Sequence, residues 1–178
     1  SIMDSAWRDD LFKFAMHRTV DVAYGAAAKR KKIIENGADY VIINYDGLAI
    51  VEEAVANGGF DCIIVDEATH YKNPQTNRWK TLNRIIKPNT WLWMMTGTPA
   101  AQSPLDAYGL AKLINPNKVP RFFGSFRDQV MYKVTNFRWA AKDTATEVVY
   151  NALQPAIRFT KEECLDLPPM VYVKREVE

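Results

Sequence analysis

The segment FDCIIVDEATHYKN, residues 60–73, runs through a series of apolar side chains and then places two carboxylates side by side, Asp66 and Glu67. An unbroken apolar run of this kind is typical of a central parallel strand that is covered on both faces. Two interpretations of its acidic end are open. The acids either sit in a solvated surface turn, or they hold a divalent cation and activate a water molecule.

Short apolar runs alternate with helix-like stretches around this segment. Strands are expected at residues 19–24, 40–44, 60–65 and 91–95, and helices at residues 26–35, 47–56, 74–87 and 104–114. This order predicts an α/β domain with a mostly parallel sheet flanked by helices. Beyond residue 116 the pattern loosens, with one more helix expected at 145–155 and an extended tail at 167–178.

Length and composition set few limits on function. A chain of 178 residues can bury a core as one domain, and its net charge of +2 singles out no partner. Cys62 and Cys164 lie far apart and match no metal-binding spacing. No apolar run approaches the roughly 20 residues that span a bilayer. The sequence therefore predicts a disulfide-free intracellular protein that does not contact a membrane.

A second polar cluster, Thr96, Gly97 and Thr98, follows the strand expected at residues 91–95. Parallel strands of an open α/β sheet place ligand sites at their carboxyl ends, so the two clusters are expected to meet. Asp66 suits Mg²⁺ held through water, because that ion loses its waters reluctantly. Glu67 can orient and deprotonate a water for attack on a phosphoryl group. The two threonines offer hydroxyls, and Gly97 lets the backbone approach closely.

Other groups of side chains are open to more than one interpretation. The Trp and Met residues of segment 91–95 are expected in the core, since such side chains are usually buried. Arg and Lys mix with aromatic residues over 121–142, which could follow a DNA backbone or form a helical brace over the sheet. The basic run at 29–32 fits a solvated helix face.

The joint pattern resembles motifs II and III of superfamily two helicases, and the Lys-Asn pair after the acids resembles the Swi/Snf-type branch, close to its small phage and bacterial members. The similar segments are SIMDSAWRDDL (1–11), VIINYDGL (41–48), VDEATHYKN (65–73), MMTGTPAAQSPLDAYGL (94–110), LINPNKVPRFFGSFRDQ (113–129) and AIRFTKEECLDLPP (156–169). The resemblance implies a RecA-like fold of the P-loop NTPase type. It also implies ATP-driven movement along double-stranded DNA as the parent activity, in the cytoplasm of a prokaryote or a phage-infected cell.

The resemblance assigns roles to individual residues. Asp66 would serve Mg²⁺ and Glu67 the water that attacks ATP, while residues 96–98 would couple hydrolysis to DNA contacts. The implied DNA-binding residues are Ser5, Asn44, Tyr45, Lys72 and Arg158.

This sequence departs from the family pattern at three positions. Thr69 stands where the branch often has His, Asn44 replaces the commoner Thr, and Phe159 stands where a second Arg is usual. No histidine role is therefore transferred to His70.

The sequence also contains no GxxxxGK[ST] phosphate loop. We therefore expect one partial helicase ATP-binding domain, with an α/β core at 1–115 and an extension at 116–178 that leads to a second RecA-like lobe. On its own this polypeptide is expected to hydrolyse ATP negligibly, because nothing grips the triphosphate. Residues 91–95 are expected to form an exposed edge strand that invites self-association.

Three alternatives stay open at this point. The chain could be a non-catalytic α/β module that binds DNA or Mg²⁺, or a degenerate lobe that has lost the phosphate loop. A phosphoacceptor domain fits less well, because its acids would lie on two different strands. A glycine-rich GKT loop directly upstream of Ser1 would favour the motor lobe.

Overall fold

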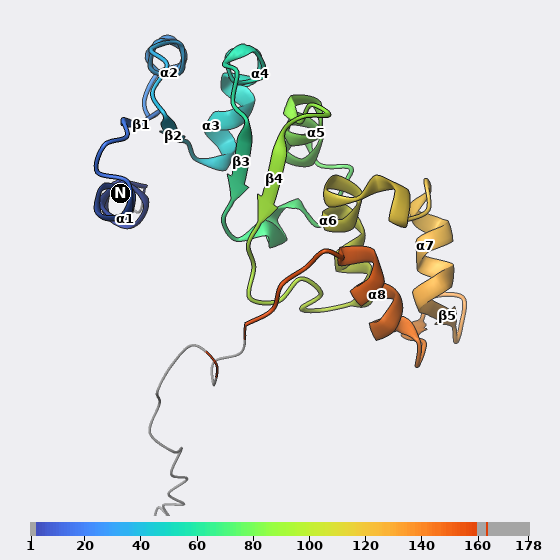
Figure 1. Cartoon of the computed structure of the whole chain (residues 1–178). Helices are drawn as coiled ribbons and strands as arrows, with labels where there is room; N and C mark the ends of the chain where they lie inside the picture. The colour runs from blue at the N-terminus through green and yellow to red at the C-terminus, as the bar shows by residue number, and fades with distance from the viewer. Residues whose placement is uncertain (1–2, 160–162, 164–178) are drawn as a thin grey trace, which may run out of the picture.

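The computed structural model describes residues 3–159 and 163, and two pairs of parallel strands run through it (Figure 1). Strand β1 (Val20–Val22) pairs with β2 (Tyr40–Ile42), and β3 (Cys62–Val65) pairs with β4 (Trp91–Met94). The predicted architecture of parallel strands flanked by helices is confirmed. The tail expected at residues 167–178 lies outside the described residues.

The helices between the strands follow the predicted order with shifted boundaries. Helix α2 (Ala27–Glu35) lies where it was expected. The single helix expected at 47–56 is instead two helices, α3 (Tyr45–Ile50) and α4 (Glu52–Asn57). Val51 separates them, because its backbone (φ −121°, ψ 26°) leaves the helical region.

Helix α5 (Asn77–Ile85) begins three residues later than the sequence pattern suggested. Asn73 does not cap it, because the Asn73 side chain accepts a hydrogen bond from the backbone N–H of Gln75 (2.9 Å) in a turn before the helix. The cap is Thr76, whose hydroxyl accepts from the backbone N–H of Trp79 (3.3 Å).

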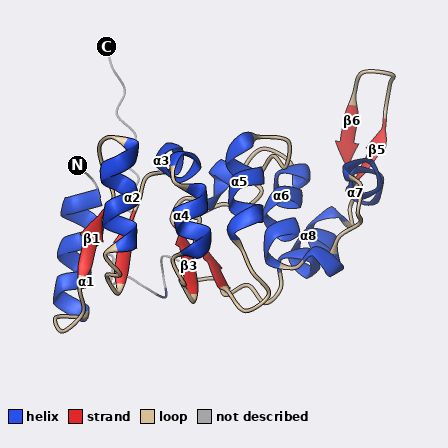
Figure 2. Ribbon diagram, turned by 90° about the horizontal axis from the view of Figure 1, so that it is seen from above, coloured by secondary structure: helices blue, strands red, loops and turns tan. Residues whose placement is uncertain are grey.

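The remaining elements lie at the two ends of the chain and around the strand ends. They are η1 (Met3–Arg8), α1 (Asp9–Phe14), η2 (Ala68–Tyr71), η3 (Pro104–Asp106), α6 (Ala107–Ile114), η4 (Pro116–Lys118), α7 (Phe123–Val130), β5 (Met131–Lys133), β6 (Trp139–Ala141) and α8 (Ala145–Leu153). The sequence did not predict the helices at 3–14 or the antiparallel β5–β6 hairpin, which projects from the body in Figure 2. Within the described part of the chain, no helix is long and apolar enough to cross a membrane.

The larger of the two hydrophobic clusters joins β3 and β4 to helices α5, α6, α7 and α8. Leu82, Leu110 and Phe126 are almost fully buried in it, and Leu92 and Met94 of β4 pack against it. A smaller cluster under α2 and α4 contains Ala23, Ile34 and Val51. Burial on this scale is what holds the strand ends, and so the site, in place.

Helix α6 lies unusually close to η2. A Cβ atom built on Gly109 would lie 2.2 Å from the carbonyl oxygen of Lys72, so only glycine fits at this position. The indole N–H of Trp79 donates to the carbonyl oxygen of Gly109 (2.8 Å), which ties α5 to the same point. Helix α6 therefore packs directly against η2, the short helix that follows the two acids.

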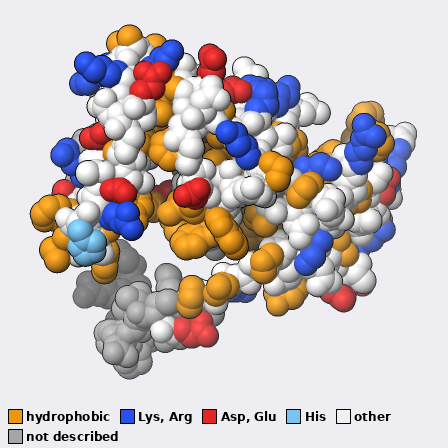
Figure 3. Space-filling model, turned by 45° about the horizontal axis from the view of Figure 1, so that its top comes forward, with side chains coloured by type: hydrophobic (Ala, Val, Ile, Leu, Met, Phe, Trp, Pro, Cys, Tyr) orange, Lys and Arg blue, Asp and Glu red, His pale blue; other side chains and the backbone are white. Residues whose placement is uncertain are grey.

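The sequence prediction that the Trp residues of strand 91–95 lie in the core is wrong. Trp91 is 70% exposed and Trp93 is 59% exposed, on the same face as Ile64 of β3. Side chains alternate between the faces of a strand, and among the described residues the helices cover only the face that carries Leu92 and Met94. Within the described part of the chain, β3 is likewise covered on one face and not on both, contrary to expectation. Several other hydrophobic side chains also reach the surface drawn in Figure 3.

The basic and aromatic segment at 121–142 forms helix α7 and the β5–β6 hairpin, and its helix takes the bracing role considered for it. Phe126 and Val130 of α7 are buried, so this helix braces the core. The Arg127 guanidinium lies 4.1 Å from the centre of the Trp139 ring, which joins α7 to β6. The hairpin tip is open to solvent, where Phe137 is 98% exposed.

Candidate functional site

The carboxyl ends of β3 and β4 lie side by side and bring the two predicted polar clusters together. The backbone N–H of Met95 donates to the carbonyl oxygen of Val65, and that of Ala68 donates to the carbonyl oxygen of Met95, each at 2.8 Å. These bonds continue the parallel ladder past the ends of the strands. The Thr96 hydroxyl then donates to Glu67 Oε1 at 3.2 Å. The predicted meeting of the two strand ends is confirmed.

Asp66 and Glu67, called the acid turn below, diverge because the chain bends sharply between them. Glu67 adopts a left-handed conformation (φ 42°, ψ 63°), the only positive φ outside glycine among the described residues. This conformation costs a non-glycine residue about 1–3 kcal/mol, and it is found most often at functional sites. The fold therefore holds a strained turn at the point where the sequence places its two acids.

Each carboxylate of the acid turn has its own hydrogen-bond donors. Asp66 Oδ1 accepts from the backbone N–H of Glu67 (2.9 Å), and Asp66 Oδ2 accepts from the indole N–H of Trp7 (3.3 Å). Glu67 Oε1 accepts from the hydroxyls of Thr69 (2.6 Å) and Thr96 (3.2 Å). Both acids are exposed, so a ligand can reach them.

The Thr69 hydroxyl lowers the pKa of Glu67 below its ordinary value. Burial is the next largest effect and opposes this shift, while the Thr96 hydroxyl and the charge of His70 lower the pKa further. Hydrogen bonds to the ionised form favour that form. Glu67 is consequently a carboxylate at neutral pH. A weakened base of this kind is better suited to orienting a water molecule than to removing its proton early.

A pocket of about 260 Å³ opens beside Glu67 and is lined by residues from η2 and from the loop after β4. Lys72 supplies a cation to it, and its ammonium lies 3.3 Å from Asp106 Oδ1 and 3.3 Å from Gln102 Oε1. Thr98 also lines this pocket, and its backbone N–H donates to the Thr96 hydroxyl (3.3 Å). A Cβ atom on Gly97 would meet no atom within 4 Å, so packing does not require glycine there.

Residues predicted to face DNA are found in several different settings. Asn44 Oδ1 accepts from the Arg30 guanidinium (2.9 Å), and the Tyr45 hydroxyl donates to the carbonyl oxygen of Asp66. One oxygen atom of each of these two side chains is thus hydrogen-bonded within the chain. Arg158 is exposed beyond α8, and the side chain of Ser5 lies outside what the structure describes. Among the described side chains, no hydrogen bond, ion pair or ring contact joins Lys72 to Asn44, Tyr45 or Arg158.

Some contacts at the site were not predicted from the sequence. Trp7 reaches Asp66 across 59 positions of the chain, and only the resemblance of segment 1–11 hinted at a functional role for that region. Thr69 is a departure from the family pattern, and no hydrogen bond from its hydroxyl to Glu67 was predicted. No local pattern marks Arg78, whose guanidinium lies 5.0 Å from the centre of the Tyr45 ring.

The residues present are compatible with Mg²⁺. Among the described residues no group of three or more His, Cys, Asp or Glu side chains could hold a metal by itself. Mg²⁺ usually needs only one or two carboxylates, because it keeps several waters and binds substrate phosphates. Asp66 offers such a carboxylate, exposed and fixed by two donors.

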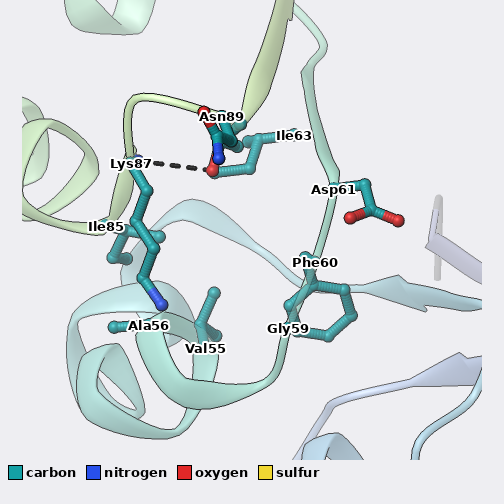
Figure 4. A pocket seen from close by; sticks show the side chains of 10 residues that line it. Val55, Ala56, Gly59, Phe60, Asp61, Ile63, Ile85, Lys87 and Asn89 are labelled. Carbon is teal, nitrogen blue, oxygen red and sulfur yellow. Dashed lines mark hydrogen bonds between the residues drawn. The ribbon is translucent and has the colours of Figure 1, made fainter.

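A second pocket, of about 180 Å³, lies at the opposite end of β3 and β4 (Figure 4). Phe60 and Asp61 precede β3 there, and Lys87 and Thr90 lie before β4. The backbone N–H of Lys87 donates to the Thr90 hydroxyl (3.3 Å), which closes the turn between them. This pocket is separated from the acid turn by the length of the strands.

Comparisons with known proteins find similarity in sequence and in overall fold. A family model described as SNF2-related domain matches residues 1–178. A Xenopus laevis SWI/SNF-related matrix-associated actin-dependent regulator of chromatin subfamily A-like protein 1 is 32% identical over 46% of this chain and 8% of its own length. An uncharacterized ATP-dependent helicase of Mycoplasma genitalium is 26% identical over 97% of this chain, which corresponds to 16% of that protein.

The fold is shared with a solved structure, the Sulfolobus solfataricus SWI2/SNF2 ATPase core in complex with dsDNA. The TM-score is 0.71 at 24% sequence identity, over 94% of this chain and 34% of that chain. This chain thus spans only a fraction of the relatives that it matches. Because the family model covers the sequence from end to end and the α/β fold is that of a SWI2/SNF2 ATPase core, the chain belongs to the SNF2-related domain family.

Proposed function

We propose that this chain is part of the first motor lobe of an ATP-dependent translocase or helicase that acts on double-stranded DNA. Membership of the SNF2-related domain family supports the class of activity. The observation that carries the proposal is the hydrogen bond between Thr96 and Glu67, because it joins the two strand ends at one site. A solvated acidic turn would not need a partner from the neighbouring strand.

In this proposal the acid turn divides two tasks. Asp66 holds Mg²⁺ through retained waters, and the bound ion would supply charge neutralisation at the phosphate oxygens of ATP. Glu67 orients the attacking water with the carboxylate oxygen that is not shared with Thr69 and Thr96. Positioning accounts for most of phosphoryl-transfer catalysis, so a fixed, ionised carboxylate suits this task.

Residues 96–98 link hydrolysis to the rest of the motor. A change in the contacts of Glu67 on hydrolysis would be felt directly by the Thr96 hydroxyl, 3.2 Å away. Thr98 lies on the same loop and lines the pocket that contains Lys72. The loop after β4 therefore contacts the acid turn through Thr96 and lines the Lys72 pocket through Thr98. These two contacts allow the loop to transmit a change at the acid turn to that pocket.

The DNA partner is proposed from the solved relative, which was determined with dsDNA. The exposed Arg158 is available for phosphate contact, as are Lys133 and Arg138 on the open β5–β6 hairpin. Ser5, Asn44 and Lys72 remain proposed members of the DNA-facing side, as does the ring of Tyr45, whose hydroxyl is hydrogen-bonded to the carbonyl oxygen of Asp66.

Other parts of the motor are proposed to lie outside this sequence. The 178 residues contain no GxxxxGK[ST] loop, so we propose that ATP is held jointly with a phosphate loop and a second RecA-like lobe of the parent protein. Among the described strands β4 pairs only with β3, so we propose that its other edge is where isolated copies could associate. A cytoplasmic site of action in a prokaryote or phage-infected cell completes the proposal.

The test is DNA-stimulated ATP hydrolysis by the natural full-length protein. Glu67→Gln should lower kcat by at least about 100-fold while ATP binding is retained, because the amide cannot orient water as a carboxylate does. Glu53→Gln removes an exposed acid of α4 away from the site and should leave kcat unchanged. Normal turnover in the Glu67 variant would refute the assignment.

The missing phosphate loop in this sequence also favours a second candidate, a non-catalytic module that binds DNA or Mg²⁺. The same protein separates the two candidates. A full-length protein that binds DNA but shows no ATP hydrolysis, with or without DNA, would favour the module.

A further inference from the structure

The Tyr45 hydroxyl is hydrogen-bonded to the main chain of the acid turn and not to its carboxylates. It is the first residue of α3, and its hydroxyl donates to the carbonyl oxygen of Asp66. The same peptide unit carries the N–H of Glu67, which donates to Asp66 Oδ1 (2.9 Å). Tyr45 therefore holds one side of the peptide plane from which both carboxylates diverge.

The orientation of this peptide plane decides where both acids point. Glu67 has a left-handed backbone, which a non-glycine residue keeps only when its surroundings hold it there. The bond from Ala68 N–H to the carbonyl oxygen of Met95 (2.8 Å) fixes the chain after the turn. The Tyr45 hydroxyl fixes it before the turn.

The Tyr45 side chain is itself held on several sides. Its ring lies 4.7 Å from the His70 ring and 5.0 Å from the Arg78 guanidinium. Arg78 in turn donates to Asp46 Oδ1 (2.7 Å) and lies 3.2 Å from His70 Nδ1. These contacts restrict the Tyr45 ring, and therefore its hydroxyl, to one position, as a residue that positions another group requires.

The residue before Tyr45 is fixed as well. Asn44 Oδ1 accepts from Arg30, which is only 6% exposed and also donates to the carbonyl oxygens of Ala23 and Gly25, each at 2.7 Å. Gly47 leaves the room for this arrangement, since a Cβ there would lie 2.2 Å from the Arg30 guanidinium. The backbone that carries Tyr45 is thus anchored to the end of β1.

We propose that Tyr45 is a positioning residue for ATP hydrolysis, which fixes the Asp66–Glu67 peptide through the Asp66 carbonyl oxygen and so aims both carboxylates. This role rests on the proposed function of the acid turn. It differs from a DNA contact, because the hydroxyl that would meet a phosphate is already bonded inside the domain.

The test compares Tyr45→Phe with a matched control in the natural full-length protein. Tyr45→Phe should lower the kcat of DNA-stimulated ATP hydrolysis about tenfold, because the carboxylates of Asp66 and Glu67 lose their fixed orientation. The KM for ATP and the Kd for duplex DNA should stay within about twofold of wild type, because no contact with either ligand is removed. The control is Tyr108→Phe, which removes a hydroxyl that donates to the carbonyl oxygens of Pro120 (3.0 Å) and Arg121 (2.9 Å). It should lower stability and leave kcat unchanged.

Two outcomes would overturn the proposal. An unchanged kcat in Tyr45→Phe would show that the hydroxyl does not aim the acids. A loss of duplex affinity as large as the loss of kcat would make Tyr45 a DNA contact instead.

Amide hydrogen exchange provides a readout that does not depend on activity. In Tyr45→Phe the amides of Glu67 and Ala68 should exchange about tenfold faster, while the amides of α6 stay unchanged. If wild type fails to hydrolyse ATP, the proposed function fails, and the exchange rates still decide whether Tyr45 holds the turn. Unchanged exchange at both amides would refute that hold.

Discussion

Replacing Gly109 by Ala should destabilise the domain by forcing α6 away from η2. The new Cβ would lie 2.2 Å from the carbonyl oxygen of Lys72 and 2.5 Å from that of Tyr71. Non-bonded carbon contacts are optimal near 3.5–4.0 Å, so the two elements must separate by roughly 1 Å. Both contacts are with main-chain atoms, and no side-chain rotation can relieve them.

The size of the effect follows from three contributions. Overpacking a core contact costs about 1–3 kcal/mol, and weakening the 2.8 Å bond from Trp79 to the Gly109 carbonyl oxygen costs about 1 kcal/mol more. Alanine recovers about 1 kcal/mol of helix propensity. The expected net loss is about 2 kcal/mol, which lowers Tm by about 6 °C for a domain of this size.

Urea unfolding of the chain, followed by far-UV circular dichroism and tryptophan fluorescence, measures this loss. Gly124→Ala is the matched control, because Gly124 also lies in a helix but its Cβ would meet no atom within 4 Å. It should gain about 0.5–1 kcal/mol. If Gly109→Ala proves as stable as Gly124→Ala, the close approach of α6 to η2 is refuted.

Three further changes test other parts of the structure. The pKa of Glu52 is lowered mainly by hydrogen bonds from Arg84 (2.5 and 2.7 Å), so this pair stabilises the fold above the unfolded-state pKa and is lost as the pH falls through the folded-state pKa. Glu52→Gln should therefore flatten the fall in the urea midpoint between about pH 5 and pH 3, whereas an unchanged slope would count against the pair. Trp93→Lys should reduce self-association in sedimentation velocity, since Trp93 is 59% exposed on the open face of β4, and equal association of both proteins would exclude that face. Arg30→Lys should cost about 1–3 kcal/mol in urea unfolding, because the compact ammonium cannot reach all three acceptors that the guanidinium reaches from two separate nitrogens, and a stable variant would contradict this.

The sequence alone was sufficient to identify the four parallel strands and the polar residues at the carboxyl ends of β3 and β4. The apolar run at 62–65 followed by Asp66 and Glu67 is local information, and so is the Thr-Gly-Thr sequence after the next strand. The rule that parallel strands present their carboxyl ends at one edge was enough to predict that the two clusters meet. The hydrogen bond between Thr96 and Glu67 bears this out.

Helix boundaries were harder to predict because competing local hydrogen bonds decide them. Asn73 and Thr76 can each cap a helix, and the sequence favoured Asn73. In the structure Asn73 closes a turn instead, and Thr76 caps α5. Both outcomes use the same side-chain chemistry, so only the packing of α5 on its neighbours selects between them.

What only the tertiary structure decided is which side chains are covered and which distant groups meet. An apolar strand has the same sequence whether one face or both are packed, and this is why Trp91 and Trp93 were assigned to the core although the helices cover only the opposite face. The hydrogen bond of the Tyr45 hydroxyl was not predicted, because the place of Tyr45 in a motif does not say where its hydroxyl points. Its hydroxyl contacts Asp66, 21 positions away, because α3 and η2 are packed together. Tertiary packing creates contacts between distant parts of a chain, and local sequence does not specify them.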